Sequence, residues 1–192
     1  MNIQDFTPFL PSWEEIFKKQ KELKFLYEPE SQELFENFSI DCFEDQELFK
    51  KYCWRINEEC IEAEEARYLE EEEHTKEELI DAMNFSIELM LLYGWSEKDY
   101  EEVNSYVPCD KNTLTVTEGI RYRLGILANC LKNRQWRRSQ YLVDLLIFEK
   151  RFKDFISFGY QRLLRAFGSD EAIREAWSLK YKVNLFRIQS NY

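Results

Sequence analysis

Residues 58–94 read EECIEAEEARYLEEEEHTKEELIDAMNFSIELMLLYG and decide the fold class of this chain. The glutamate-rich first part continues a helical pattern that starts well before it, so we predict a helix over residues 45–73. Thr75 and Glu78 then have the spacing of a capping box, which predicts that a second, strongly apolar helix starts there and stops near Gly94. Because the connection between them is short, the two helices are expected to pack antiparallel.

The helical pattern continues on both sides of this pair. Ser12 and Glu15 have capping-box spacing in front of a helix that ends at or before Pro29. The low numbers of glycine (5) and proline (4) argue against a turn-rich sandwich or barrel. We therefore predict an all-α fold, a helical bundle that forms one domain over residues 1–192. Its remaining segments are a weakly periodic stretch at 33–38 and helices over about 96–106, 117–133, 138–167 and from 169 onward.

The negative charge of the chain is strongly localised. Residues 58–81 hold 12 acidic and two basic residues, a net −10 out of a formal −11 for the whole chain. Residues 105–192 hold 16 basic and eight acidic residues, so the second half is net positive. The overall acidity argues against a general nucleic-acid binder. The lack of an apolar run of about 18 residues predicts no membrane span.

Several kinds of chemistry and location are excluded or indicated by composition alone. His74 is the single histidine, which excludes zinc sites with several histidines and Ser-His-Asp triads. No glycine-rich phosphate-binding motif occurs, so side chains or a metal would have to hold any phosphate. The five cysteines form no C-x-x-C motif and the N-terminus has no basic leader pattern, which predicts reduced thiols and a cytoplasmic location.

Two carboxylate pairs with i,i+3 spacing face each other across the predicted helix pair. They are Glu59 with Glu62, and Glu78 with Asp81. The second pair lies on an otherwise apolar helix, where buried carboxylates are costly without a cation. Oxygen ligands without histidine or cysteine suit Mg²⁺ or Mn²⁺. The alternative is a solvated pair of acidic helices, in which Glu78 is only the capping partner of Thr75.

Two motifs about 100 residues apart resemble one known superfamily. E58-E59-C-I-E62 followed after 15 residues by E78-L-I-D81 resembles the E-E-x-x-E…E-x-x-D signature of the all-α nucleoside triphosphate pyrophosphohydrolases, which include MazG-type enzymes and dimeric dUTPases. ELIDAMNFSIELMLLYGW is also similar to the family's E-L-x-D-x-x-H-F, with Asn84 in place of the histidine. The final LKYKVNLFRIQSNY resembles the closing K-x-x-x-N-x-F-R-x-x-N-G-Y of dimeric dUTPases and phage dCTP/dUTP pyrophosphatases, with Ser-Asn in place of Asn-Gly.

This resemblance implies a fold and an activity. The fold would be a MazG/dimeric-dUTPase-like four-helix core with three parts: a metal-binding helix pair (45–106), a helical insertion (108–168) and a C-terminal substrate-binding segment (169–192). The activity would be Mg²⁺-dependent hydrolysis of a pyrimidine deoxynucleoside triphosphate, dUTP before dCTP, to the monophosphate and pyrophosphate. The enzyme would be a homodimer in the cytoplasm of a bacterium or a phage-infected host.

The resemblance also assigns roles to individual residues. Glu59, Glu62, Glu78 and Asp81 would bind the metal, and Glu62 would orient or deprotonate the attacking water. The substrate-binding residues would be Lys180, Asn184, Arg187, Tyr192, Trp54 and Gln20. Two of these have a simpler interpretation, because Trp54 could be ordinary core packing and Gln20 an exposed helix residue.

Two other functions fit the same sequence. One is a broad-specificity MazG-type hydrolase, which would share the acidic motifs but not the base preference. The other is a non-catalytic acidic helical protein that binds a regulatory protein partner, for which the pattern at the C-terminus would have no purpose.

Overall fold

A computed structural model describes residues 9–105, 115–131 and 143–190, and within these ranges every regular element is a helix. The predicted all-α fold class is confirmed. None of the described helices is long and apolar enough to cross a membrane. In chain order the helices are α1 (Trp13–Tyr27), α2 (Ser31–Asn37), α3 (Phe43–Tyr68), α4 (Glu72–Leu92), α5 (Glu97–Ser105), α6 (Val116–Cys130), α7 (Leu145–Phe167) and α8 (Asp170–Gln189).

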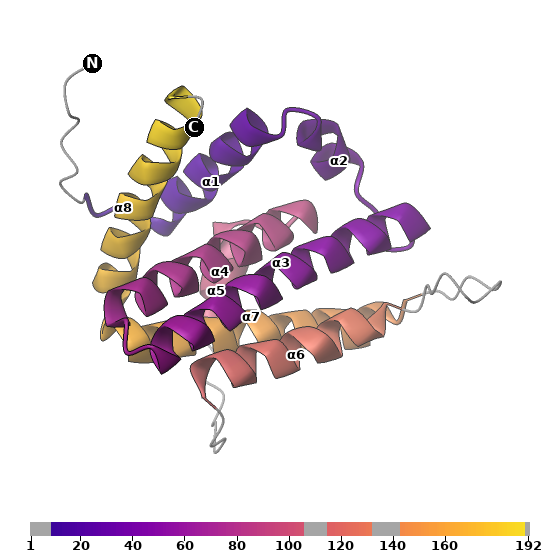
Figure 1. The fold of residues 1–192 in the computed structure, drawn as a ribbon. Helices are drawn as coiled ribbons and strands as arrows, with labels where there is room; N and C mark the ends of the chain where they lie inside the picture. The colour runs from indigo at the N-terminus through magenta and orange to yellow at the C-terminus, as the bar shows by residue number, and fades with distance from the viewer. Residues whose placement is uncertain (1–8, 106–114, 132–142, 191–192) are drawn as a thin grey trace.

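The helices form layers around the central pair α3 and α4, which run antiparallel side by side as predicted (Figure 1). Helices α1 and α8 lie on one side of this pair, and α6 and α7 lie on the other (Figure 1). The core between the layers is apolar and aromatic, and its largest fully buried side chains include Phe49 of α3, Ile87 of α4, Phe152 of α7 and Trp177 of α8. The central pair is therefore held from both sides.

Local sequence signals explain where several helices start. Ser12 and Glu15 form the predicted capping box at the start of α1, and α8 starts directly after its N-cap residue Ser169. Gly168, which ends α7, has a φ of 87°, a left-handed conformation that favours glycine. After this stop and restart, α8 packs against α1, α4 and α7.

The turn between α3 and α4 differs from the prediction. Helix α3 ends at Tyr68 rather than at residue 73, and α4 begins at Glu72, one turn earlier than expected. Thr75 is inside α4, where its hydroxyl donates to the backbone oxygen of Glu71, so the predicted capping box of Thr75 and Glu78 is wrong. Of the run of four glutamates, Glu70 and Glu71 lie in the turn, where Glu70 has a φ of 62°, and Glu72 and Glu73 lie in the first turn of α4, where acidic residues are favoured. Glu78 is thereby free of a capping role.

Other boundaries also shift. Helix α7 starts at Leu145 rather than near residue 138, because the Asp144 side chain accepts from the backbone N–H of Ile147 and caps the helix there. Helix α6 ends at Cys130, before the expected residue 133. The stretch that was expected to be weakly periodic contains the short helix α2.

Candidate metal centre and adjoining pocket

Three carboxylates from the central helix pair meet at one point. Glu59 of α3 and Glu78 and Asp81 of α4 each offer an oxygen atom, and these atoms all lie within 4.8 Å of one another. Glu78 and Asp81 project from one face of α4 because they are three residues apart. Glu78 is only 6% exposed, so one of these carboxylates is inside the protein. We refer to Glu59, Glu78 and Asp81 as the carboxylate trio.

The trio is electrostatically unfavourable when all its members are ionised. Burial, a hydrogen bond with Glu78 and the charge of Asp81 raise the pKa of Glu59 to about 8. Burial also raises the pKa of Glu78 and the pKa of Asp81. A cation at this point would allow all three carboxylates to be charged together. An all-oxygen donor set of this kind fits Mg²⁺ or Mn²⁺.

The fourth predicted ligand lies apart from the trio. Glu62 is on α3, one turn after Glu59, and its side chain is exposed. Its negative charge contributes to the raised pKa of Glu59. The structure therefore brings together three of the four predicted ligands and leaves Glu62 beside them.

Lys180 of α8 supplies a positive charge next to the trio. Its Nζ atom lies 2.6 Å from Asp81 Oδ2 and 2.6 Å from Glu77 Oε1, and the side chain is 9% exposed. Burial lowers the pKa of Lys180, but the hydrogen bonds to Asp81 and Glu77 outweigh this effect and raise the pKa above its ordinary value. The same ammonium group holds the pKa of Glu77 below its usual value. The positively charged ammonium group of Lys180 thus occupies part of the space around Asp81.

His74 lies close to the opposite side of the trio. Its Nδ1 atom is 3.2 Å from Glu78 Oε1 and 3.8 Å from Glu77 Oε2. The single histidine of the chain, which the sequence assigned no role, is therefore in contact with a candidate metal ligand.

A pocket of about 350 Å³ opens beside the trio, between α1, α3, α4 and α8. This volume lies within the range that small-molecule sites occupy. Six of the predicted site residues line it: Gln20, Glu59, Asp81, Lys180, Asn184 and Arg187. They come from four different helices, and up to 167 residues separate them in the chain.

The far end of the pocket is a buried polar cluster. Gln20 is 3% exposed, so its interpretation as an exposed helix residue is wrong. Its Nε2 atom donates to Glu88 Oε1 at 2.9 Å. Lys24 Nζ lies 2.8 Å from Glu28 Oε2 and 3.6 Å from Glu88 Oε2. Gln20, Lys24 and Glu88 together form what we call the polar end of the pocket.

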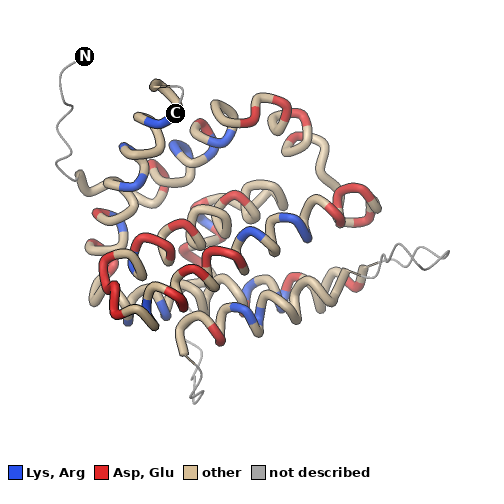
Figure 2. The backbone as a smooth tube through the Cα atoms, in the orientation of Figure 1, with Lys and Arg blue, Asp and Glu red and all other residues tan. Residues whose placement is uncertain are grey.

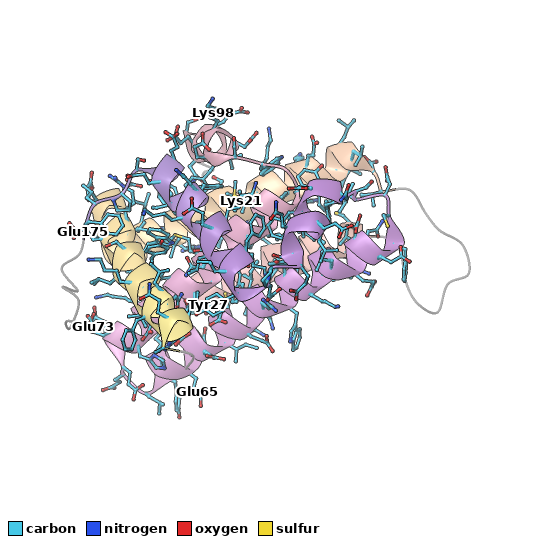
Figure 3. The ribbon with its side chains drawn as sticks, turned by 90° about the horizontal axis from the view of Figure 1, so that it is seen from above. Lys21, Tyr27, Glu65, Glu73, Lys98 and Glu175 are labelled. Atoms are coloured by element: carbon cyan, nitrogen blue, oxygen red, sulfur yellow. The ribbon has the colours of Figure 1, made fainter. Side chains whose placement is uncertain are left out.

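The C-terminal half of α8 closes one wall of the pocket against α1. Tyr27, labelled in Figure 3, lies at the end of α1 and its hydroxyl donates to the backbone oxygen of Asn184 at 3.3 Å. Asn184 and Arg187 lie on the same side of α8 as Lys180, since they follow it by four and seven residues. This spacing aligns the three side chains along the pocket.

Two predicted substrate-binding residues are not part of this arrangement. Trp54 is 61% exposed, which makes the prediction of core packing wrong, and it does not line the pocket. Its Nε1 atom instead donates to Glu58 Oε1 at 2.7 Å on the outer surface of α3. Tyr192 lies outside the described residues.

The sequence interpretation missed further pocket residues. Glu28, Arg55, Asn84, Phe85 and Glu88 line the pocket in addition to those predicted. For the α4 residues among them a signal was available, because they follow Asp81 by three, four and seven residues and so share its helix face. For Glu28 and Arg55 only the packing of the helices placed them here.

The charge pattern of the backbone agrees with the contacts. Acidic residues gather at the turn end of α3 and α4, while α8 carries several lysines and arginines beside it (Figure 2).

Comparison of the chain with known protein families, curated proteins and solved structures finds no match.

Proposed function

We propose that this protein is a divalent-metal-dependent pyrophosphohydrolase that cleaves a pyrimidine deoxynucleoside triphosphate to the monophosphate and pyrophosphate. One observation supports this most strongly: a single pocket is lined by Glu59 and Asp81 of the carboxylate trio, by Lys180, Asn184 and Arg187 of α8 and by Gln20 of α1. The two separated motifs that resemble those of the all-α pyrophosphohydrolases contain all of these residues except Gln20.

In this proposal, different residues bind the metal and the phosphates of the charged polyphosphate. Glu59, Glu78 and Asp81 would hold the metal, which when bound neutralises phosphate charge and lowers the pKa of a water molecule. Lys180 and Arg187 donate hydrogen bonds to phosphate oxygens, and the planar guanidinium of Arg187 can contact two oxygens at once. The Lys180 ammonium group has three N–H donors, and its contacts with Asp81 and Glu77 leave one of them for phosphate.

Glu62 fits the role of general base better than that of a buried ligand. It is exposed beside Glu59 and so has access to water, which a residue that orients or accepts a proton from water needs. In this proposal Glu62 acts on the water, while the three clustered carboxylates bind the cation.

The experiment is a hydrolysis assay of the purified protein with dUTP, dCTP, dTTP and dATP in the presence of Mg²⁺. Pyrophosphate release from a pyrimidine substrate is expected, and release from none of the four would overturn the proposal. Equal rates with all four would indicate the broad-specificity alternative instead.

Variants connect the activity to the site. Asp81→Asn should lower turnover by about 100-fold or more, since the trio loses a charged ligand, and Glu62→Gln should lower kcat while leaving metal affinity close to that of the wild type. Glu65→Gln is the matched control, because Glu65 is an exposed glutamate on the same helix (labelled in Figure 3). A Glu62→Gln variant with full activity would remove Glu62 from the mechanism.

A further inference from the structure

The Glu88 carboxylate at the polar end of the pocket has an oxygen that no described residue satisfies. Glu88 is 5% exposed, and its Oε1 atom accepts from Gln20 Nε2 at 2.9 Å. Its Oε2 atom accepts no hydrogen bond from the described residues, and the Lys24 ammonium group is 3.6 Å away. An unsatisfied buried acceptor raises the free energy of the folded protein, because the group has lost its hydrogen bonds to water. A donor on a ligand would remove this cost.

The position of Glu88 along α4 places it well away from the carboxylate trio. Glu88 follows Asp81 by seven residues, two turns on the same helix face, which corresponds to about 10 Å along the axis. A sugar and a pyrimidine ring together span a similar length. Phosphates held near Asp81 and Lys180 would therefore bring the base of the same nucleotide to Glu88.

The polar end is suited to a neutral group that donates hydrogen bonds. An ionised carboxylate offers only acceptors, and Asn84, one turn before Glu88 on α4, also has a buried Oδ1 atom without a partner among the described residues. Lys24 lies next to Glu88 and balances its charge. The two buried atoms without a hydrogen-bond partner at this end, Glu88 Oε2 and Asn84 Oδ1, are thus both acceptors.

We propose that Glu88 is a specificity-determining residue that accepts a hydrogen bond from the exocyclic amino group of a 4-aminopyrimidine and thereby selects this base over a 4-oxopyrimidine. This rests on the proposed function, and it reverses the order of substrates that the family resemblance implies. Carboxylates recognise the amino group of cytosine in the same manner in nucleic-acid complexes. A 4-oxopyrimidine has a single ring N–H between two carbonyl oxygens. These carbonyl oxygens would face the carboxylate and repel it.

The test compares dCTP and dUTP as substrates of the wild-type protein and of Glu88→Gln. The wild type should show at least about a tenfold higher kcat/KM for dCTP. In Glu88→Gln the ratio should fall to about one or reverse, because the amide can donate to a 4-oxo group. Glu72→Gln, an exposed glutamate of the same helix, serves as the control and should keep the wild-type ratio.

A second measurement separates selection from catalysis and from folding. Thermal stabilisation by dCMP and by dUMP in the absence of metal should favour dCMP in the wild type and lose this preference in Glu88→Gln. Hydrolysis of both triphosphates with a preference for dUTP, or an unchanged ratio in a folded Glu88→Gln variant, would overturn the role of Glu88 and leave the proposed function standing. Hydrolysis of dTTP or dATP alone would also overturn the role of Glu88, and pyrophosphate release from none of the four triphosphates would instead overturn the proposed function.

Discussion

Glu78 fits two sequence patterns, that of a helix cap and that of a ligand pair, and the structure excludes the helix cap. Its spacing from Thr75 suits a helix cap, and its spacing from Asp81 suits a ligand pair. In the structure α4 starts before Thr75, and the Glu78 carboxylate is buried against Glu59 and Asp81. At the scale of the residue, the pKa of a carboxyl group depends on whether the group is shielded from water. Burial raises the pKa of all three carboxyl groups.

These shifts predict how the stability of the metal-free protein depends on pH. Between the ordinary value of 4.5 and about 8, folded Glu59 binds more protons than it does in the unfolded chain. The free energy of unfolding should therefore decrease as pH rises through this window. We expect a lower Tm at about pH 8 than at about pH 5.5, measured by circular dichroism, and a smaller difference in Glu59→Gln.

The control for this prediction is Glu65→Gln, which removes an exposed carboxylate from the same helix and should retain the wild-type pH dependence. Added Mg²⁺ should raise the Tm mainly at the higher pH, because it binds the ionised carboxylates. If the Tm of Glu59→Gln falls with rising pH as steeply as that of the wild type, the assignment of this pH dependence to Glu59 is contradicted.

At the scale of the element, two glycines of helix α6 are expected to respond in opposite ways to replacement by alanine. A methyl group added at Gly125 would meet no atom within 4 Å beyond the adjacent residues and backbone of its own helix. At Gly119 the same methyl group would overlap the ring of Phe158, which is 1% exposed. That ring cannot move easily, since the guanidinium of Arg123 lies 3.5 Å from its centre and that of Arg162 lies 4.4 Å away.

We predict that Gly125→Ala stabilises the protein and Gly119→Ala destabilises it. Alanine in an open helix interior is favoured over glycine by about 0.5–1 kcal/mol, which corresponds to an increase of a few degrees in Tm. Overpacking at Gly119 should cost about 1–3 kcal/mol and exceed this gain. Thermal unfolding of both variants checks the prediction, and equal shifts in the same direction would show that α6 does not pack on α7 through Gly119.

At the scale of the whole molecule, α8 brings positive charge to the acidic half of the chain. Lys180 joins α8 to α4 through Asp81 and Glu77, although 99 residues separate Lys180 from Asp81 in the sequence. The ammonium group and a metal ion would compete for Asp81, so the fold itself affects metal affinity. The localised net charge of −10 is thus partly balanced by tertiary contacts.

Replacement of Lys180 by methionine should separate metal binding from turnover. Lys180→Met should bind Mg²⁺ about fivefold more tightly without nucleotide, since loss of an ion pair worth about 1 kcal/mol removes the competition. Turnover should fall because a phosphate contact is lost. Isothermal titration with Mg²⁺ and the hydrolysis assay measure the two effects, and Lys182→Met controls for the change in net charge. Unchanged or weaker Mg²⁺ binding would contradict the competition.

Much of the fold and part of the site could be predicted, and the errors have identifiable causes. Ser12, Gly168 and Ser169 mark helix ends correctly because capping depends on local hydrogen bonds. The simpler interpretations of Gln20 as an exposed residue and of Trp54 as core packing are both wrong, since a helix pattern with a weak apolar face does not reveal which side another helix will cover.

The sequence by itself determined the helical class and the antiparallel pair of acidic and apolar helices, and it named six of the fourteen residues that line the pocket. The helical class, the helix pair and the pairing of carboxylates depend on periodicity and spacing within single helices, where neighbours in the chain are neighbours in space. Gln20, Lys180, Asn184 and Arg187 were named only by the family resemblance. Only the tertiary structure decided that Glu62 lies outside the trio, that Lys180 pairs with Asp81 and that Glu88 has an unused oxygen. Such contacts arise from the angles at which separate helices pack, and spacing along the chain contains no record of those angles.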